Sequence, residues 1–240
     1  MQVLGIVTAR GASKGLARKN ILPLCGKPVL QYTVEAALAA RHLARVILST
    51  EDEEIAEVGR RCGLEVPFLR PAQLARDDTP HVPVLQHAVR TLEQAGCVYD
   101  AIMTLQPTTP LRRASDIDGS IALMERTGAD SVISFVEVGE RHPARMKFID
   151  ATGRVIDPPF AEKREGQRRQ ELEPLYLREG SIYLTRHDVL MKHNSIKGTD
   201  CRAWIMPLDR ACNIDDPFSF FLAEQLLKFH NHVQASDPRR

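Results

Sequence analysis

Cationic residues and glycines follow the first apolar run of the chain. The run at residues 3–7 opens into a loop that carries Arg10, Lys14 and Lys19 among glycines and a serine. In α/β proteins, a buried strand that ends in such a loop presents backbone N–H groups and cations to a polyphosphate. The loop has neither the Gly-Lys-Ser/Thr ending of a P-loop nor a G-x-G-x-x-G motif. It therefore predicts a triphosphate site of another nucleotide-handling class, and a solvated basic turn is the alternative.

Alternating strands and helices are predicted to position this loop. Apolar, β-branched runs predict strands at 3–7, 46–48, 66–69, 101–105 and 131–136. Between them, apolar residues recur at helical spacing in 30–38, 55–62, 85–92 and 117–124. Repeated βα units of this kind imply a mostly parallel sheet covered by helices on both faces. Ligands of such sheets bind at the carboxyl ends of the strands, which is where the basic loop lies.

The regular alternation of predicted strands and helices ends after Val138. The runs 145–149 and 154–156 flank Asp150-Ala151-Thr152-Gly153, a pattern typical of a β-hairpin. A long polar stretch, 157–174, follows, and regular structure returns with a strand at 181–184, a short helix at 188–193, a strand at 203–206 and a final helix. Loops of this length are usually functional or disordered. We expect a domain at 1–230, an insertion at about 139–175, and a flexible tail at 231–240.

Composition excludes several classes of protein. The 240 residues can bury one substantial core, and the net charge of +1 favours neither nucleic acid nor an anionic membrane as partner. Five scattered cysteines without C-x-x-C spacing disfavour a zinc site or a disulfide framework. No signal-peptide pattern and no run of about 18 apolar residues is present. These features predict a soluble cytoplasmic protein.

Four short motifs together indicate a family. They are the basic loop, Phe68-Leu69-Arg70-Pro71, the segment 105–112 (LQPTTPLR) and Asn213-Ile214-Asp215. With them the chain resembles the acylneuraminate cytidylyltransferases, which make CMP-sialic acids and related CMP-nonulosonates, from Val3 to about Leu227. The resemblance implies a Rossmann-like α/β nucleotidyltransferase fold, Mg²⁺ as cofactor, and a homodimer. In that homodimer, the hairpin insertion of one subunit reaches the active site of the other.

The resemblance also assigns the nucleotide site. Cations are needed there because charge grows on the departing pyrophosphate when the α-phosphorus is attacked. Arg10, Lys14 and Lys19 supply that charge, and the amide of Asn20 would orient a ribose or phosphate oxygen. Arg70 matches a residue that helps to hold cytosine, with Asp77 in the adjoining loop. The expected nucleotide-binding set is Arg10, Gly11, Ser13, Lys14, Lys19, Asn20, Arg70 and Asp77.

For the acceptor sugar, the resemblance implies a second group of residues. Gln106 follows the predicted strand 101–105, where its side chain would face the crevice. Arg145 and Arg169 match cations that arrive from the partner subunit, and a guanidinium can grip the carboxylate of a sugar acid with two hydrogen bonds. Tyr183 matches a tyrosine of the sugar pocket.

Two departures from the family pattern stand out. The family commonly has Asp-Ile-Asp for Mg²⁺, whereas here Asn213 replaces the first carboxylate and Asp215 remains. Alternation along an extended segment puts both side chains on one side, and an amide oxygen is also a ligand for magnesium. The second departure is Tyr176-Leu177-Arg178-Glu179-Gly180, where many sialic acid enzymes have Tyr-Arg-Glu-Asn-Gly. Together with the lack of an aromatic pair in Asn194-Ser195-Ile196, it makes a legionaminic-type, pseudaminic-type or deaminated acid a competitor of N-acetylneuraminate.

The expected reaction joins CMP from CTP to the anomeric hydroxyl of such an acid and releases pyrophosphate. Arg10, Lys14, Lys19 and Asp215 are the expected catalytic residues. One alternative is a nucleotidyltransferase for a sugar phosphate, an alditol phosphate or another keto sugar acid. Another is a module that binds CTP with weak or no turnover, which the Asn213 replacement favours. The choice between cytosine and guanine stays open at this stage.

Overall fold

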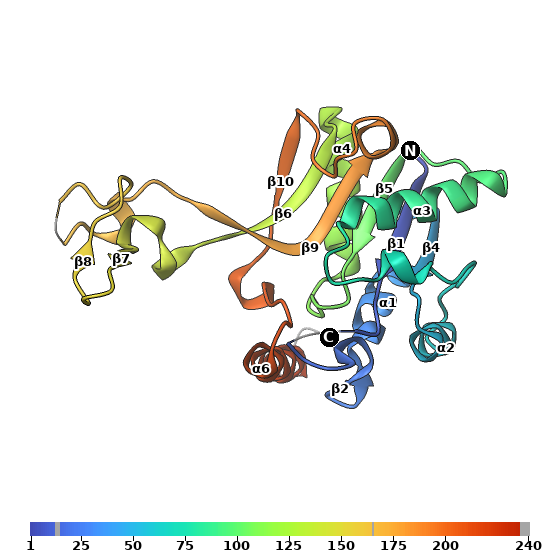
Figure 1. Ribbon diagram of the computed structural model, residues 1–240, viewed down its shortest axis with the longest axis horizontal. Helices are drawn as coiled ribbons and strands as arrows, with labels where there is room; N and C mark the ends of the chain where they lie inside the picture. The colour runs from blue at the N-terminus through green and yellow to red at the C-terminus, as the bar shows by residue number, and fades with distance from the viewer. Residues whose placement is uncertain (13–14, 165, 236–240) are drawn as a thin grey trace.

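The computed structural model describes residues 1–12, 15–164 and 166–235. A six-stranded sheet in the order β10-β6-β9-β5-β1-β4 forms its centre (Figure 1). The strands are β1 (Val3–Thr8), β4 (Arg45–Ser49), β5 (Ala101–Leu105), β6 (Ser131–Glu137), β9 (Tyr176–Arg186) and β10 (Cys201–Ile205). Neighbouring strands are parallel except at β9, which runs antiparallel to both β5 and β6. The mostly parallel α/β sheet predicted from the sequence is confirmed.

Two layers of helices bury the faces of the sheet. Neighbouring residues of each central strand point to opposite faces, so Val7 packs with Leu30 of α1 and Ile117 of α4, while Ile6 packs with Leu85 of α3. Both faces are therefore apolar, as is usual in parallel sheets. The helices are α1 (Val29–Ala39), α2 (Glu53–Arg61), α3 (His81–Gln94), α4 (Ala114–Thr127), α5 (His187–Met191) and α6 (Pro217–Ala235). The 3₁₀ turns are η1 (Lys19–Ile21), η2 (Ala72–Leu74), η3 (Gly139–Arg141), η4 (Pro143–Arg145), η5 (Arg169–Glu171) and η6 (Leu208–Arg210).

Residues 138–175 form an arm that projects from one edge of the molecule (Figure 1). Strands β6 and β9 leave the sheet as a two-stranded ribbon that pairs Glu137 with Tyr176 and leads into the arm. At its end, β7 (Phe148–Ile149) and β8 (Val155–Ile156) form the hairpin predicted from the sequence, with shorter strands than expected. The Asp150 carboxylate closes the turn by accepting from the backbone N–H groups of Thr152 and Arg154.

Two sequence expectations differ from the structure. The predicted strand at 66–69 is wrong: only Glu65 makes an isolated bridge to β4, and Pro67 follows, which fixes φ and has no N–H to donate. The final helix, α6, continues to Ala235, so the expected boundary at 230 falls inside a helix. It packs through Leu227 on Leu24 of a small hairpin of β2 (Pro23–Leu24) and β3 (Lys27–Pro28).

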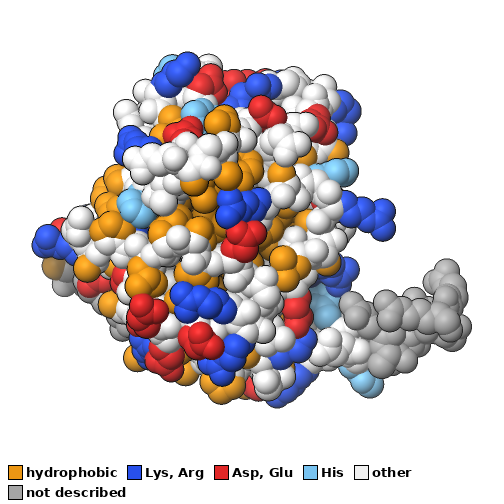
Figure 2. All heavy atoms as spheres, turned by 90° about the vertical axis from the view of Figure 1, so that its right-hand side faces the viewer, with side chains coloured by type: hydrophobic (Ala, Val, Ile, Leu, Met, Phe, Trp, Pro, Cys, Tyr) orange, Lys and Arg blue, Asp and Glu red, His pale blue; other side chains and the backbone are white. Residues whose placement is uncertain are grey.

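The surface carries no single-sign field on the side seen in Figure 2, where basic and acidic side chains are interspersed. This pattern agrees with the net charge of +1. Among the described residues, no helix combines the length and the hydropathy that a membrane span needs.

Candidate active site

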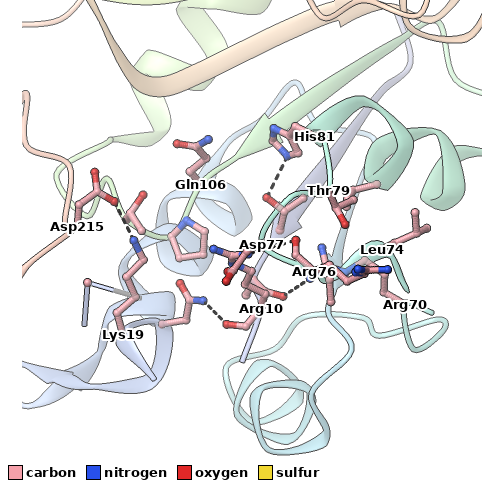
Figure 3. Close-up of a pocket in the computed structure, with 18 of the residues that line it drawn as sticks. Arg10, Lys19, Arg70, Leu74, Arg76, Asp77, Thr79, His81, Gln106 and Asp215 are labelled. Carbon is pink, nitrogen blue, oxygen red and sulfur yellow. Dashed lines mark hydrogen bonds and ion pairs between the residues drawn. The ribbon is translucent and has the colours of Figure 1, made fainter. Parts of the chain in front are cut away.

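A cavity of about 600 Å³ opens at the carboxyl ends of β1 and β5, where the sequence placed the site (Figure 3). The basic loop forms one wall, the start of α3 with the segment before it forms another, and residues 213–215 close a third side. Eight residues expected from the sequence line it: Arg10, Lys19, Asn20, Arg70, Asp77, Gln106, Asn213 and Asp215. Ser13 and Lys14 lie outside the described residues.

Glu51, two residues after the end of β4, anchors the basic loop. Its carboxylate accepts from Gly11 N at 2.8 Å and from Arg70 Nη2 at 2.6 Å. The same Nη2 donates to the carbonyl of Ala9 at 3.0 Å, and Arg70 is only 5% exposed. Arg70 is thus a buried clamp of the loop as well as a wall of the cavity, and its Nε is buried with no partner among the described residues. The position of Glu51 just past a strand end was the sequence signal that could have revealed it.

Gly11 is a support of the loop, not part of the cavity wall. An added Cβ there would clash with Asp52 Oδ2. Asp52 also receives the guanidinium of Arg18, which reaches Glu54 as well. The hydrogen bond between Arg18 and Asp52 raises the pKa of Arg18 and lowers the pKa of Asp52. Arg18 is therefore held by the start of α2 and does not line the cavity.

The side chains of Arg10 and Asp77 meet in the cavity (Figure 3). Arg10 Nη1 lies 3.0 Å from Asp77 Oδ1 and 3.3 Å from the carbonyl of Arg76. Asn20 Nδ2 donates to the carbonyl of Arg10 at 3.0 Å, so its amide supports the loop backbone. The structure brings these three residues together, with Asp77 as the counter-charge of Arg10.

Lys19, Asn213 and Asp215 form a second polar cluster. Lys19 Nζ lies 2.9 Å from Asp215 Oδ1 and 2.9 Å from the carbonyl of Ile214. Asn213 Nδ2 donates to Asp215 Oδ2 at 2.8 Å, so the two side chains meet on one side of the segment, as alternation predicted. The segment is fixed because Ile214 N donates to the carbonyl of Thr108 at 2.8 Å. No cluster of three or more His, Cys, Asp and Glu side chains suited to a metal occurs in the described parts of the chain.

Arg112 supports Gln106 by binding its backbone carbonyl. The buried guanidinium donates to the carbonyls of Gln106 at 2.7 Å and Ser181 at 2.6 Å, and to the hydroxyls of Thr33 and Thr109. Burial lowers the pKa of Arg112 to about 10, so the group stays charged at neutral pH. It ties the Gln106 loop to β9.

Tyr183 lies beside this loop but outside the cavity. It is a central residue of β9, 8% exposed, and pairs with Thr104, two residues before Gln106. Its pKa is raised by burial. The guanidinium of Arg178 lies over its ring, 5.9 Å from the ring centroid.

Arg145 and Arg169 do not reach the cavity of their own chain. Both belong to the arm, in the turns η4 and η5. Arg145 Nη2 donates to the carbonyl of Gln167 at 3.2 Å within the arm. The arm points away from the core that holds the cavity (Figure 1).

His81 also lines the cavity. Its Nε2 lies 3.4 Å from the hydroxyl of Thr8 at the end of β1. Burial, with the nearby charge of Arg70, lowers the pKa of His81 to about 4. The imidazole is therefore neutral at physiological pH and adds hydrogen-bonding capacity without charge.

Solved structures first define the class of the fold. The chain aligns with a CMP:2-keto-3-deoxy-manno-octonic acid synthetase solved with CTP, with a TM-score of 0.70 and 17% identity over 96% of this chain and 100% of that one. A 4-diphosphocytidyl-2C-methyl-D-erythritol synthase of Anaerococcus prevotii gives 0.63 and 14% over 95% and 96%. The fold is that of the nucleotidyltransferases, as expected from the resemblance.

Sequence relatives narrow the class to a family. The cytidylyltransferase family model matches residues 4–231. A CMP-N,N′-diacetyllegionaminic acid synthase of Legionella pneumophila is 27% identical over 97% of this chain and 99% of its own length. A pseudaminic acid cytidylyltransferase of Campylobacter jejuni is 29% identical over 98% and 100%. The chain belongs to the cytidylyltransferase family and is a nucleotidyltransferase.

The match to a third relative is partial. An N-acylneuraminate cytidylyltransferase of Streptococcus agalactiae is 30% identical over 90% of this chain but 51% of its own length. The resemblance stated from the four motifs is confirmed.

Proposed function

We propose that the protein transfers CMP from CTP to the anomeric hydroxyl of a nonulosonic acid. The observation that carries the proposal is the single cavity in which Arg10, Lys19 and Asp215 meet Gln106. The cavity thus offers the cations Arg10 and Lys19 to a triphosphate and the polar side chain of Gln106 to the acceptor sugar. Relatives that match over their whole length and are named for legionaminic and pseudaminic acids support these acids as the acceptor class.

Each residue has a task in the proposed transfer. The acceptor hydroxyl oxygen bonds to the α-phosphorus of CTP and gives up its proton to solvent, the bond from that phosphorus to the bridging oxygen breaks, and pyrophosphate leaves with the electron pair. Arg10 and Lys19 neutralise the charge that grows on the leaving oxygens. Arg70 lines the cavity, where its guanidinium would contact the cytosine base. Gln106 orients the acceptor.

Mg²⁺ is part of the proposal, because the donors at residues 213–215 suit it. The side chains of Asp215 and Asn213 meet on one side of an extended segment, and Mg²⁺ favours one or two carboxylates supplemented by phosphates and water. Bound there, the ion would neutralise phosphate charge. Lys19 and Asn213 hold the Asp215 carboxylate at the cavity wall, and the ion would take the place of these contacts.

A homodimer completes the proposal. The arm exposes large apolar side chains along its length, namely Met146, Phe148, Ile149, Val155, Ile156 and Phe160. Such side chains stay in water only at a cost, so a second copy of the chain is the natural cover. In that arrangement, Arg145 and Arg169 would bring cations to the acceptor side of the partner's cavity. A cytoplasmic location fits the five cysteines, all of which are free.

Pyrophosphate release with CTP and Mg²⁺ tests the activity. The acceptor panel is N,N′-diacetyllegionaminic, pseudaminic, N-acetylneuraminic and 2-keto-3-deoxy-manno-octonic acids, with sugar 1-phosphates and GTP as controls. Release with a nonulosonic acid supports the proposal. Release only with a sugar phosphate favours the sugar-phosphate transferase, and CTP binding without release favours the sensing module.

Mixed subunits test the shared site. Arg145→Ala subunits keep an intact cavity, and Lys19→Met subunits keep an intact arm. After mixing by dissociation and reassembly, only the mixed dimer holds one complete site, so activity should return to about a quarter of the wild-type value when half of the dimers are mixed. If activity does not recover in a mixture shown to contain mixed dimers, the hypothesis of a site shared between subunits is refuted.

A further inference from the structure

Arg210 and Asp116 form a buried ion pair between η6 and the first turn of α4. Arg210 Nη2 donates to Asp116 Oδ1 at 3.0 Å, and Arg210 Nη1 donates to Asp116 Oδ2, so the pair is bidentate. The two side chains are 10% and 4% exposed. The backbone N–H of Arg113, at 2.8 Å, and the indole N–H of Trp204, at 3.4 Å, donate to the same carboxylate. The carboxylate is therefore fixed from several directions.

This ion pair joins two segments that line the cavity. The first is the acceptor loop, residues 106–112, which begins with Gln106 and leads into α4. The second is the metal segment, residues 211–215, which ends with Asp215. Arg210 directly precedes the metal segment, and its Nη1 also donates to the carbonyl of Leu111 in the acceptor loop at 3.4 Å. One guanidinium thus holds both the end of the acceptor loop and the helix that follows it.

A second contact joins the same two segments. The backbone N–H of Ile214 donates to the carbonyl of Thr108 at 2.8 Å. The buried side chains of Cys212 and Ile214 pack with Leu111 in one apolar cluster. The hydrogen bond fixes one point of the chain at Ile214, and the ion pair fixes another point four residues earlier. Two fixed points leave the metal segment little freedom to shift relative to the acceptor loop.

Stability alone is a weak reason for a buried ion pair at this place. Removing two charges from water costs about as much as their attraction returns, and apolar side chains of similar volume often serve as well. A bidentate guanidinium, however, fixes both a distance and a direction. Group transfer depends on such precision, because a displacement of about 1 Å can lower the rate by about 10²-fold.

We infer that Arg210 and Asp116 are a positioning pair, which sets the distance between Gln106 and the carboxylate of Asp215. This inference rests on the proposed function, in which Gln106 orients the acceptor and Asp215 holds the metal. Neither residue of the pair lines the cavity formed by the described chain, so the pair acts through the two segments that it joins. Its loss would lower kcat and loosen the metal segment, with little change in the affinity for CTP.

Three variants separate position from stability. Arg210→Gln and Asp116→Asn each leave one buried charge unpaired, whereas the double variant has two amides and the net charge of wild type. In all three, kcat should fall by about 10- to 100-fold, with the KM for CTP within about threefold of wild type. The double variant should regain thermal stability without regaining the rate, because two amides do not reproduce the guanidinium–carboxylate geometry. Arg210→Lys, which keeps the charge without the fork, should lose less activity than Arg210→Gln.

Hydrogen–deuterium exchange of the protein without ligands gives a second readout. The backbone amides of residues 211–216 should exchange about tenfold faster in Arg210→Gln than in wild type, because one of the two fixed points is lost. Leu190→Ala is the matched control, since Leu190 is fully buried in the cluster on the other face of the sheet and its truncation lowers stability. At a temperature where all variants are folded, it should leave kcat and the exchange of residues 211–216 unchanged.

The inference is overturned by any of three results. They are a wild-type kcat in the single variants, a return of the wild-type rate together with stability in the double variant, and unchanged exchange of residues 211–216 in Arg210→Gln. If Arg210→Gln does not fold, Arg210→Lys and the double variant decide the same question. Failure of the proposed function is a different result. Wild type would then release no pyrophosphate with any acid, while the exchange experiment would still show whether the pair holds the metal segment.

Discussion

The two sides of the cavity differ in how far one chain completes them. On the nucleotide side, Arg10, Lys19 and Arg70 each face a carboxylate before any ligand arrives. On the acceptor side, the proposed cations Arg145 and Arg169 lie on the exposed arm and do not reach the cavity of their own chain. Because their carboxylate partners already hold these cations in place, binding a triphosphate costs little side-chain entropy. The acceptor side instead gains its order from the ligand and from a second subunit.

Removing the carboxylate of Asp215 should break the nucleotide side most severely. Asp215→Asn takes away the charged oxygen donor of the proposed metal site and the counter-charge of Lys19. We expect kcat to fall by about 10³-fold, the upper range for loss of one preorganised electrostatic group. The measurement is pyrophosphate release across a Mg²⁺ titration, with exposed Asp188→Asn as the control. Turnover that keeps the wild-type Mg²⁺ dependence would show that a group other than Asp215 binds the metal.

Loss of the Lys19 cation should have the next largest effect. Lys19→Met keeps the length of the side chain but leaves the leaving oxygens less neutralised, so kcat should fall by about 10²-fold. Lys27→Met, which removes a lysine paired with Glu35 on the surface, should stay near wild type. Single-turnover rates of pyrophosphate release check this. An equal loss in both variants would show that the rate depends on the overall charge of the protein and not on the position of Lys19.

The anchor Glu51 should affect binding and stability together. Glu51→Gln leaves Gly11 N and the buried Arg70 with a weaker acceptor, so the loop loses its fixed position. We expect the KM for CTP to rise by about tenfold and the free energy of unfolding to fall by about 1–3 kcal/mol. Urea titration and initial rates measure the two quantities, and Glu57→Gln on the exposed face of α2 is the control. A change in stability without a change in the KM for CTP would show that Glu51 stabilises the fold but does not position the nucleotide site.

The smallest expected effect concerns the acid stability of the cavity wall. The pKa of His81 is lowered to about 4 in the folded protein, below its ordinary value near 6.5. The unfolded chain therefore binds the proton more readily, and stability falls as pH drops from about 6.5 toward 4. Between pH 7.5 and 5, His81 alone should cost about 2 kcal/mol, which His81→Gln should abolish. Urea titrations at the two pH values compare the variants, and an unchanged pH slope would refute the assignment.

Local patterns predicted most of the fold but misplaced some element ends. Alternation of apolar runs and helical periodicity identified the central strands, because each must be buried on both faces. The run 66–69 looked like another strand, but Pro67 limits pairing there and only Glu65 makes a bridge to β4. Periodicity cannot decide such a case, because pairing depends on a neighbour that is distant in sequence.

Residue types alone determined which groups of this protein can do chemistry. The cations of the first loop, Gln106 and the Asn213-Ile214-Asp215 segment were recognisable because their types and their places after strands suit phosphate and metal chemistry. The tertiary structure decided how these groups are used. It assigned Arg18 to the start of α2 and Arg70 to Glu51, and it stacked Arg178 on Tyr183. Sequence spacing cannot show these partners, since burial, pairing register and charge contacts are set by segments that meet only in the folded chain.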